Sequence, residues 1–314
     1  MTDPAERQTL SIVVPVYYNE ESLPILSSEL KTLEAELDHR GLNTELILVD
    51  DGSGDGSFEQ LMEMKRDRPQ TKIVKLTRNF GSVAAAKCGF GFVTGNCFCI
   101  LAADLQDPPN KILEMAEHWL KGQRFVICVR ESRSDPLLTR LFAAIYYKAI
   151  TFLVSRDYPS GGFDLMLLDE SFLPHMVEAG KNTHPNLYAY WLGVQPTVLT
   201  YHRGKRRHGK SRWTFAKKLK LFVDTITGFS VVPIRLISGF GLGAALLSFL
   251  YGAYIFVNGL LGRIDVPGYT TLIVLTTFFS GLILVMLGII GEYLWRVFDA
   301  TQNKPESVIE ETYL

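Results

Sequence analysis

The chain has 314 residues, of which 47% are hydrophobic and 21% are charged, and its 32 Lys and Arg residues nearly balance its 33 Asp and Glu residues. This composition excludes an intrinsically disordered chain, and a formal net charge of −1 excludes a globally basic binder of nucleic acid. We therefore expect a folded chain, long enough for one large domain or two, with no nucleic acid among its partners.

The first 130 residues alternate strand and helix patterns. Apolar, β-branched runs predict strands at 10–16, 44–49, 72–76, 96–101 and 125–129. The intervening segments predict helices at 21–39, 57–65, 82–93 and 108–120. This order predicts an α/β domain whose mainly parallel sheet is flanked by helices. In such sheets ligands bind at the carboxyl ends of the strands, so the residues that follow each strand form the candidate site.

Carboxylates follow two of these strands. Residues 50–57 read Asp-Asp-Gly-Ser-Gly-Asp-Gly-Ser, and residues 102–109 read Ala-Ala-Asp-Leu-Gln-Asp-Pro-Pro. The first strand is followed by no G-x-G-x-x-G loop, which argues against a dinucleotide-binding oxidoreductase. One Asp-Gly-Ser turn is usually a solvated loop, but two acidic clusters at one edge repel anions unless a divalent cation bridges them to a phosphate. The pattern indicates a cation-dependent site for a phosphate-bearing ligand.

Four ordered blocks resemble a known family. Residues 13–20, 49–53, 78–81 and 103–109 are similar to the signature blocks of family 2 glycosyltransferases, which have the GT-A fold. The match is best to polyisoprenyl-phosphate glycosyltransferases, such as bacterial membrane-anchored polyprenyl-phosphate glucosyltransferases and dolichol-phosphate mannose synthases. The resemblance extends over nearly the whole chain, including its apolar C-terminal part.

The resemblance implies a nucleotide site at the strand ends. The first block would border the uridine of a UDP-sugar donor through Pro15, Tyr17 and Glu20. Asp51 would hydrogen-bond the base or the ribose, as suits an acceptor-only carboxylate, and Arg78 belongs to the same nucleotide-binding set.

A metal site is implied beside the nucleotide. Asp104 would bind Mg²⁺ or Mn²⁺ bridging the diphosphate, and Gln106 would complete the site through its neutral oxygen. Ala102 fills the first position of the usual Asp-x-Asp motif, so the cation keeps more water or borrows a distant carboxylate. Asp157 is the candidate for that catalytic carboxylate, and an exposed loop residue is the alternative interpretation.

Basic residues mark an acceptor side. Arg130 and Arg140 flank or enter a segment at 136–154 with a broad apolar face, which either packs on the sheet or lies on the bilayer. Nine Lys and Arg residues and no acidic residue lie between 201 and 220. The resemblance implies that residues of both regions help to bind the acceptor phosphate, namely Arg130, Arg140, Arg203, Arg206 and Ser211, with Arg203 also catalytic. A positive-inside membrane flank is the alternative for this cluster.

The C-terminal quarter predicts a membrane hairpin. Residues 236–262 and 266–291 each lack Asp, Glu, Lys and Arg and exceed the roughly 20 apolar residues that cross a bilayer as a helix. The basic flank predicts a multi-pass protein of the inner, cytoplasmic membrane, with both termini and the catalytic domain on the cytoplasmic side. The expected domains are a catalytic domain at 1–213, an amphipathic juxtamembrane segment at 214–233, and the hairpin with a short tail at 234–314. Gly239 and Gly243 permit close packing within the hairpin or between copies in a homo-oligomer.

Cys88, Cys97, Cys99 and Cys128 stand in apolar surroundings. In a reducing compartment this pattern predicts buried thiols rather than disulfides.

The function that the sequence predicts is transfer of a single hexose, glucose from UDP-glucose, to a polyprenyl phosphate of the undecaprenyl or dolichyl type. The resemblance implies an inverting, metal-dependent reaction at the cytoplasmic face. Gly209 replaces the glutamine of the Gln-x-x-Arg-Trp motif of processive polysaccharide synthases, and two spans are too few for a polymer conduit. The alternatives are mannose transfer from GDP-mannose, a nucleotidyltransferase that releases pyrophosphate, and a non-catalytic membrane scaffold with a degenerate metal site.

Overall fold

The computed structural model describes residues 7–130, 162–181, 183–201, 232–261, 268–302 and 304–314, with single positions at 148, 150, 151, 158, 159, 223 and 225. The chain divides into two compact units. The first comprises Met1–Phe222 and Pro305–Leu314, and the second comprises Val223–Lys304. The end of the chain therefore belongs to the same unit as its beginning.

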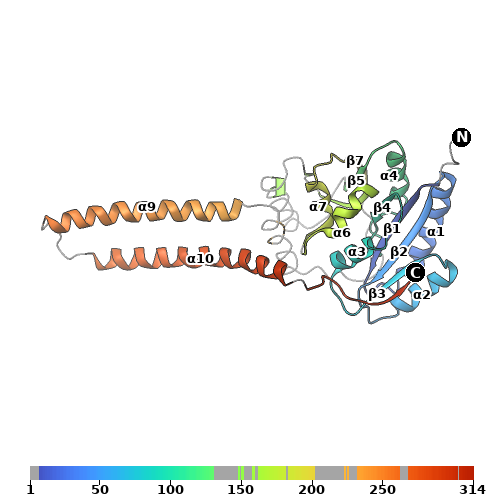
Figure 1. Ribbon diagram of the computed structural model, residues 1–314, viewed down its shortest axis with the longest axis horizontal. Helices are drawn as coiled ribbons and strands as arrows, with labels where there is room; N and C mark the ends of the chain where they lie inside the picture. The colour runs from blue at the N-terminus through green and yellow to red at the C-terminus, as the bar shows by residue number, and fades with distance from the viewer. Residues whose placement is uncertain are drawn as a thin grey trace. The chain divides into compact units, whose positions relative to one another are not determined.

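Eight strands among the described residues form one sheet in the order β7-β5-β6-β4-β1-β2-β3-β8 (Figure 1). Their bounds are β1 Thr9–Val16, β2 Asn43–Asp50, β3 Lys72–Leu76, β4 Cys97–Ile100, β5 Phe125–Arg130, β6 Phe163–Asp169, β7 Thr197–Tyr201 and β8 Ile309–Tyr313. β6 and β8 run antiparallel to their neighbours, and the other strands of this sheet share one direction. The mainly parallel sheet predicted from the sequence is confirmed.

Helices cover both faces of this sheet. Their bounds are α1 Leu23–His39, α2 Ser57–Asp67, α3 Ser82–Phe90, α4 Lys111–Leu120, α6 Leu173–Glu178 and α7 Pro185–Trp191, with a 3-10 turn at Glu170–Phe172. Leucines at three- and four-residue spacings in α1 are buried in one core with Ile12 and Val14 of β1. On the opposite face, a Cβ added at Gly89 of α3 would lie 2.4 Å from Cγ1 of Val13. Since neighbouring residues of a strand point to opposite faces, α1 and α3 lie on opposite sides of the sheet.

The sequence pattern predicts neither β6 nor β8. β6 is almost entirely apolar because it is a central strand that the helices cover, and such a run carries no two-residue alternation. β8 is a short polar segment at the end of the chain, and it pairs with β3 in the register Ile73↔Tyr313 and Lys75↔Glu311. In Figure 1 this C-terminal strand, in red, lies beside β3.

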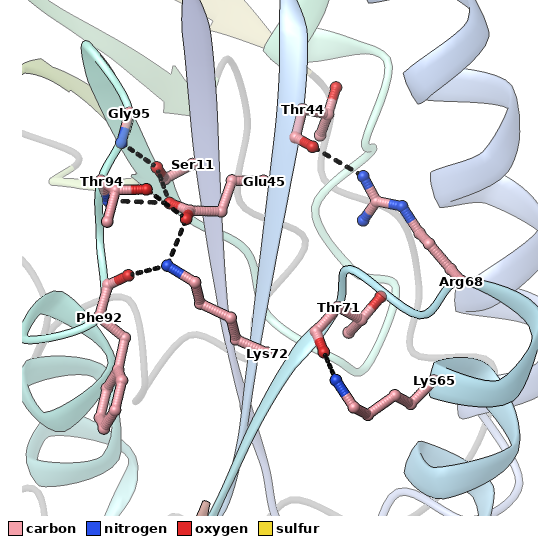
Figure 2. A network of polar contacts seen from close by, with 10 residues as sticks. All are labelled: Ser11, Thr44, Glu45, Lys65, Arg68, Thr71, Lys72, Phe92, Thr94 and Gly95. Atoms are coloured by element: carbon pink, nitrogen blue, oxygen red, sulfur yellow. Dashed lines mark hydrogen bonds and ion pairs between the residues drawn. The ribbon is translucent and has the colours of Figure 1, made fainter. Parts of the chain in front are cut away.

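A polar cluster ties the amino ends of the parallel strands together (Figure 2). The Glu45 carboxylate of β2 accepts hydrogen bonds from Ser11 Oγ at 2.5 Å, Lys72 Nζ at 2.5 Å, Thr94 N at 2.9 Å and Thr94 Oγ1 at 2.6 Å. Lys72 also donates to the Phe92 carbonyl at 2.8 Å. Burial alone would raise the pKa of Glu45, but these hydrogen bonds outweigh it and hold the pKa below its usual range.

The second unit contains two long helices, α9 at Val232–Leu260 and α10 at Tyr269–Thr301. They pack against each other, and a Cβ added at Gly241 would lie 2.7 Å from Cε of Met286. Among the described residues, one segment, Phe278–Thr301, is long and apolar enough to cross a membrane, and its most apolar stretch is not buried. The predicted second span ends at Gly291, but α10 continues beyond it to Thr301. In this extension Arg296 forms an ion pair with Glu292, one helical turn away.

Several predicted segments fall largely outside the described residues. Positions 148, 150 and 151 are helical, and the rest of the segment predicted at 136–154 lies outside. In the juxtamembrane segment at 214–233, positions 223, 225, 232 and 233 are helical and the rest lies outside, as does the turn between the two apolar runs.

The cysteines are free thiols, as predicted. Cys97, Cys99 and Cys128 are buried, and Cys88 is half-buried. Burial raises the pKa of the Cys128 thiol to about 12, so this group stays protonated and unreactive at neutral pH.

Candidate active site

The segments after β1 and β2 interlock through hydrogen bonds at the carboxyl edge of the sheet. The Tyr18 amide donates to Ser53 Oγ at 3.1 Å, and the Asn19 amide donates to Ser57 Oγ at 2.8 Å. The Gly56 amide donates to the carboxylate of Glu20 at 3.0 Å. Glu20, predicted to border the nucleotide, therefore also holds the turn that starts α2.

Asp51 connects this edge to the loop that follows β3. Its buried carboxylate accepts hydrogen bonds from Asn79 Nδ2 at 2.9 Å, Phe80 N at 2.7 Å and Gly81 N at 2.9 Å. Burial raises the pKa of Asp51, and the amides of Phe80 and Gly81 oppose that rise. Contact of Asp51 with a base or ribose stays a prediction, and the structure adds an anchoring role that the sequence pattern does not reveal.

Gly52 lets the two loops approach closely. Its φ of +67° lies in the left-handed region, and an added Cβ would lie 2.5 Å from the backbone carbon of Arg78 and 2.8 Å from the amide nitrogen of Asn79. Backbone atoms cannot move aside as a side chain can, so this position requires glycine. The guanidinium of Arg78 lies 4.5 Å from the centre of the Phe80 ring, on the outside of the same loop.

Pro15 and Tyr17 complete the set predicted for the nucleotide. Both are half-buried at the end of β1, and the ring of Tyr17 packs edge-on against that of Tyr18 at 4.7 Å. Tyr18 has a φ of 55°, which is strained for a residue with a side chain. The structure thus brings the segments that carry Tyr17, Glu20, Asp51 and Arg78 to one edge, as predicted from the strand order.

The turn after β4 carries the residues predicted for the metal. Leu105 is buried with a φ of 57°, and the Gln106 amide donates to Asp104 Oδ1 at 3.2 Å. Ser22 Oγ donates to the Ala103 carbonyl at 2.9 Å, which links this turn to the segment after β1. A left-handed conformation at a non-glycine residue costs about 1–3 kcal/mol and is concentrated at functional sites.

The donor set of this turn suits a hard divalent cation. Carboxylate and carboxamide oxygens are the ligands that Mg²⁺ and Mn²⁺ prefer, and Mg²⁺ commonly takes one or two protein carboxylates together with substrate phosphates. Asp104 and Gln106 are both half-buried and supply such oxygens. Among the described residues, no group of three or more His, Cys, Asp or Glu side chains is arranged to hold a metal ion.

A second buried cluster joins the metal turn to the predicted acceptor side. Tyr201 Oη, at the end of β7, donates to Asp107 Oδ1 at 2.5 Å, and both residues are buried. Arg130, at the end of β5, pairs with Asp164 of β6 and hydrogen-bonds Tyr201. Burial alone would lower the pKa of Arg130, but Asp164 raises it, so the guanidinium stays charged.

The sequence patterns indicate no individual role for Asp107, Asp164 or Tyr201. The signal that could reveal Asp164 is a carboxylate at the second position of the otherwise apolar stretch that precedes Asp169. Asp157, Arg140, Arg203, Arg206 and Ser211, predicted for catalysis or for the acceptor phosphate, lie outside the described residues.

The sequence of the chain is similar to those of known glycosyltransferases. The sequence model described as Glycosyl transferase family 2 matches residues 11–182. The chain is 35% identical to the uncharacterised glycosyltransferase YkcC of Bacillus subtilis (strain 168), over 96% of this chain and 94% of that protein. It is 29% identical to the SfII prophage-derived bactoprenol glucosyl transferase of Shigella flexneri, over 97% of this chain and 98% of that protein.

Solved structures agree on the fold. The chain is similar to glucosyl-3-phosphoglycerate synthase from Mycobacterium tuberculosis, with a TM-score of 0.50 and 16% identity over 71% of this chain and 80% of that one. The same enzyme crystallised with Mg²⁺ and UDP gives a TM-score of 0.50 with 15% identity, over 71% of this chain and 79% of that one. At this identity the likeness concerns the arrangement of strands and helices.

Proposed function

The chain belongs to glycosyl transferase family 2 and is a glycosyltransferase, and we propose that it transfers one glucose from UDP-glucose to a polyprenyl phosphate. The observation that carries the proposal is the edge at which Asp51 anchors the loop after β3 while Asp104 and Gln106 share a strained turn after β4. The similarity to proteins named bactoprenol glucosyl transferase supports the sugar and the lipid acceptor.

The donor half of the reaction follows from this edge. The base and ribose would lie along Pro15, Tyr17, Glu20 and Asp51, with Arg78 beside the diphosphate. Because the loops already hold one another, the site is preorganised and little ordering is needed when the donor binds. A divalent cation bound at Asp104 and Gln106 would neutralise the charge that develops on the departing UDP.

The acceptor half needs positioning more than proton removal. A phosphate monoester has its second pKa near 6, so its attacking oxygen is largely ionised at neutral pH. That oxygen forms the new bond to the anomeric carbon as the bond to UDP breaks, and UDP leaves with the electron pair, inverting the centre. Arg130, held by Asp164 and Tyr201, presents a planar fork of donors suited to orienting the phosphate, with Arg203, Arg206 and Ser211 as further candidates.

A lipid acceptor requires the enzyme to work at a membrane. The long apolar helices α9 and α10 support a membrane hairpin, and the basic run at 203–220 supports a cytoplasmic orientation of the catalytic domain. Nine cations near anionic headgroups would each add roughly 1 kcal/mol to membrane attraction. We therefore propose that the enzyme lies in the inner membrane with both termini in the cytoplasm.

The test is a transfer assay with the full chain in detergent. Radiolabelled UDP-glucose and undecaprenyl phosphate are incubated with Mg²⁺ or Mn²⁺, and the label that enters the organic phase and the UDP released are both measured. Equal amounts of labelled lipid and UDP support the proposal. Transfer from GDP-mannose alone would replace it with a mannosyltransferase, and release of pyrophosphate would replace it with a nucleotidyltransferase.

A second assay separates acceptor binding from membrane topology. Lys in place of Arg203 or Arg206 keeps the charge but loses the bidentate fork, so the acceptor KM should rise about tenfold while the donor KM stays constant. Arg207→Lys is the matched control within the same cluster. If all three variants transfer glucose equally well, the acceptor site has to be sought at Arg130 and Arg140.

A further inference from the structure

The end of the chain contacts both flanks of the loop that Asp51 anchors. We call residues 77–81 the donor loop and residues 305–314 the C-terminal tail. The donor loop begins where β3 ends and stops where α3 begins. The tail belongs to the same compact unit, although more than two hundred residues separate it from the loop.

On the β3 side, the tail forms the edge strand β8 and extends the pairing to the start of the loop. The Thr77 amide, which opens the donor loop, donates to the Val308 carbonyl at 3.0 Å. One residue pair earlier, the register shifts between Lys75 and Leu76, so the tail bends away from regular pairing where the loop starts. Lys75 Nζ forms a more exposed ion pair with Glu310 at 3.1 Å.

On the α3 side, the tail pairs with a nearly buried cation. Lys87 Nζ lies 2.7 Å from Glu306 Oε2, and the Lys87 side chain is only 7% exposed. The same ammonium donates to the Gly180 carbonyl at 2.8 Å and to the Ala179 carbonyl at 3.2 Å. Next to it, Cys88 forms a hydrogen bond with Ser307. A nearly buried ammonium needs a counter-charge, and Glu306 provides one.

Two parts of the protein, Asp51 and the C-terminal tail, hold the donor loop in place. Asp51 holds its far half through Asn79, Phe80 and Gly81, and the tail holds its start at Thr77 and the helix that follows it at Lys87. Tail residues 306, 307 and 308 thus bridge the elements on either side of the loop. A loop held at both flanks loses less entropy when it closes on a ligand.

We propose that Glu306 and Lys87 are positioning residues for donor binding, and that the C-terminal tail clamps the donor loop in its nucleotide-binding form. The inference rests on the proposed function, since the ligand of the loop is taken to be a nucleoside diphosphate. The tail follows α10 directly, so the chain segment that leaves the membrane hairpin contributes to donor affinity. A fragment of residues 1–213 lacks this clamp and leaves the edge of β3 unpaired.

The test compares two substitutions of the same kind in the full chain. Glu306→Gln removes the partner of the nearly buried Lys87, whereas Glu310→Gln, the matched control, removes the more exposed partner of Lys75. Affinity for UDP with Mg²⁺ is measured by calorimetry, and donor KM, acceptor KM and kcat are measured in the transfer assay. Hydrogen exchange of a peptide spanning residues 77–81 is followed without ligand.

Glu306→Gln should weaken UDP binding and raise the donor KM by about five- to tenfold, with the acceptor KM and kcat unchanged. Exchange at the Thr77 amide should accelerate in this variant and not in Glu310→Gln. Equal UDP affinity and equal Thr77 exchange in Glu306→Gln and wild type would overturn the proposal. Failure of the wild-type protein to bind UDP would instead refute the proposed function, and the exchange measurement would still report whether the tail holds the loop.

Discussion

At the amino ends of the parallel strands, Glu45 accepts four hydrogen bonds from Ser11, Lys72 and Thr94, and its pKa lies below the usual range. At the carboxyl ends, burial raises the pKa values of Asp50 and Asp51. Among the described residues, the buried Oδ2 of Asp50 has no hydrogen-bond partner. In the part of the chain that the structure describes, buried polar atoms without a partner also lie at the amino ends, on Thr44, Arg68 and Thr71. The two ends therefore differ in the direction in which the structure shifts their carboxyl pKa values.

The two ends respond to pH in opposite directions. The folded-state pKa of Glu45 is lowered, so its contribution to stability is present above the unfolded pKa and is lost as the pH falls through the folded pKa. The folded-state pKa of Asp50 and Asp51 is raised, so their contribution is present below the unfolded pKa and is lost as the pH rises through the folded pKa. At neutral pH the carboxyl end therefore lowers stability, which is the usual cost of a functional site.

The largest effect is expected from Asp104→Ala. This change removes the carboxylate proposed to hold the cation, so transfer should fall by about a hundredfold or more, because metal stabilisation of a leaving group is worth several kcal/mol. The melting temperature in detergent should stay close to that of wild type, since the hydrogen bond from the Gln106 amide to Asp104 is confined to a single turn. Near-normal turnover across a Mg²⁺ and Mn²⁺ titration would place the metal site elsewhere.

Gly52→Ala should damage both binding and stability, because its Cβ would meet the backbone of Arg78 and Asn79. We expect a loss of about 2–3 kcal/mol in the free energy of unfolding and a rise of about tenfold in the donor KM. Gly41→Ala is the control, since its φ of +79° is similarly left-handed but an added Cβ would meet none of the described residues within 4 Å. A donor KM that rises equally in both variants would show that close approach of the loops is unimportant.

Glu45→Gln should reduce stability without reducing activity. The change leaves the ammonium of Lys72 without its partner, so the free energy of unfolding should fall by about 2–3 kcal/mol. The difference from wild type should shrink as the pH falls through the folded-state pKa of Glu45. Turnover measured well below the melting temperature should match wild type, and a specific loss of kcat there would contradict the division between the two ends.

The smallest effect is expected from Asp50→Asn, which removes a buried charge whose second oxygen lacks a partner. Stability at pH 7 should rise by about 1 kcal/mol. Thermal unfolding across a pH series should show the gain disappearing at low pH, where Asp50 of the wild type is itself protonated. A stability loss at neutral pH would mean that the ionised carboxylate of Asp50 stabilises the fold.

Much of the sheet could be predicted because its signals are local. The runs at 10–16 and 72–76 become β1 and β3 with nearly the predicted bounds, since an apolar β-branched stretch marks a strand wherever its partners lie. The two acidic segments that contain Asp51 and Asp104 could be placed at one edge because the carboxyl ends of parallel strands meet there, whereas the roles of these two residues come from the resemblance and stay predictions. The anchoring of the donor loop by Asp51 could not be predicted, because it depends on which amides the loop after β3 presents.

The sequence by itself determined the alternation of strands and helices, the acidic edge, the two apolar runs and the membership of the family. All of these are properties of neighbouring residues or of motifs in a fixed order. Only the tertiary structure decided that the tail pairs with β3, that Glu306 reaches Lys87, and that Tyr201 joins Asp107 to Arg130. Such contacts join residues far apart in the chain, and their selection depends on strand register and burial, which no local pattern records.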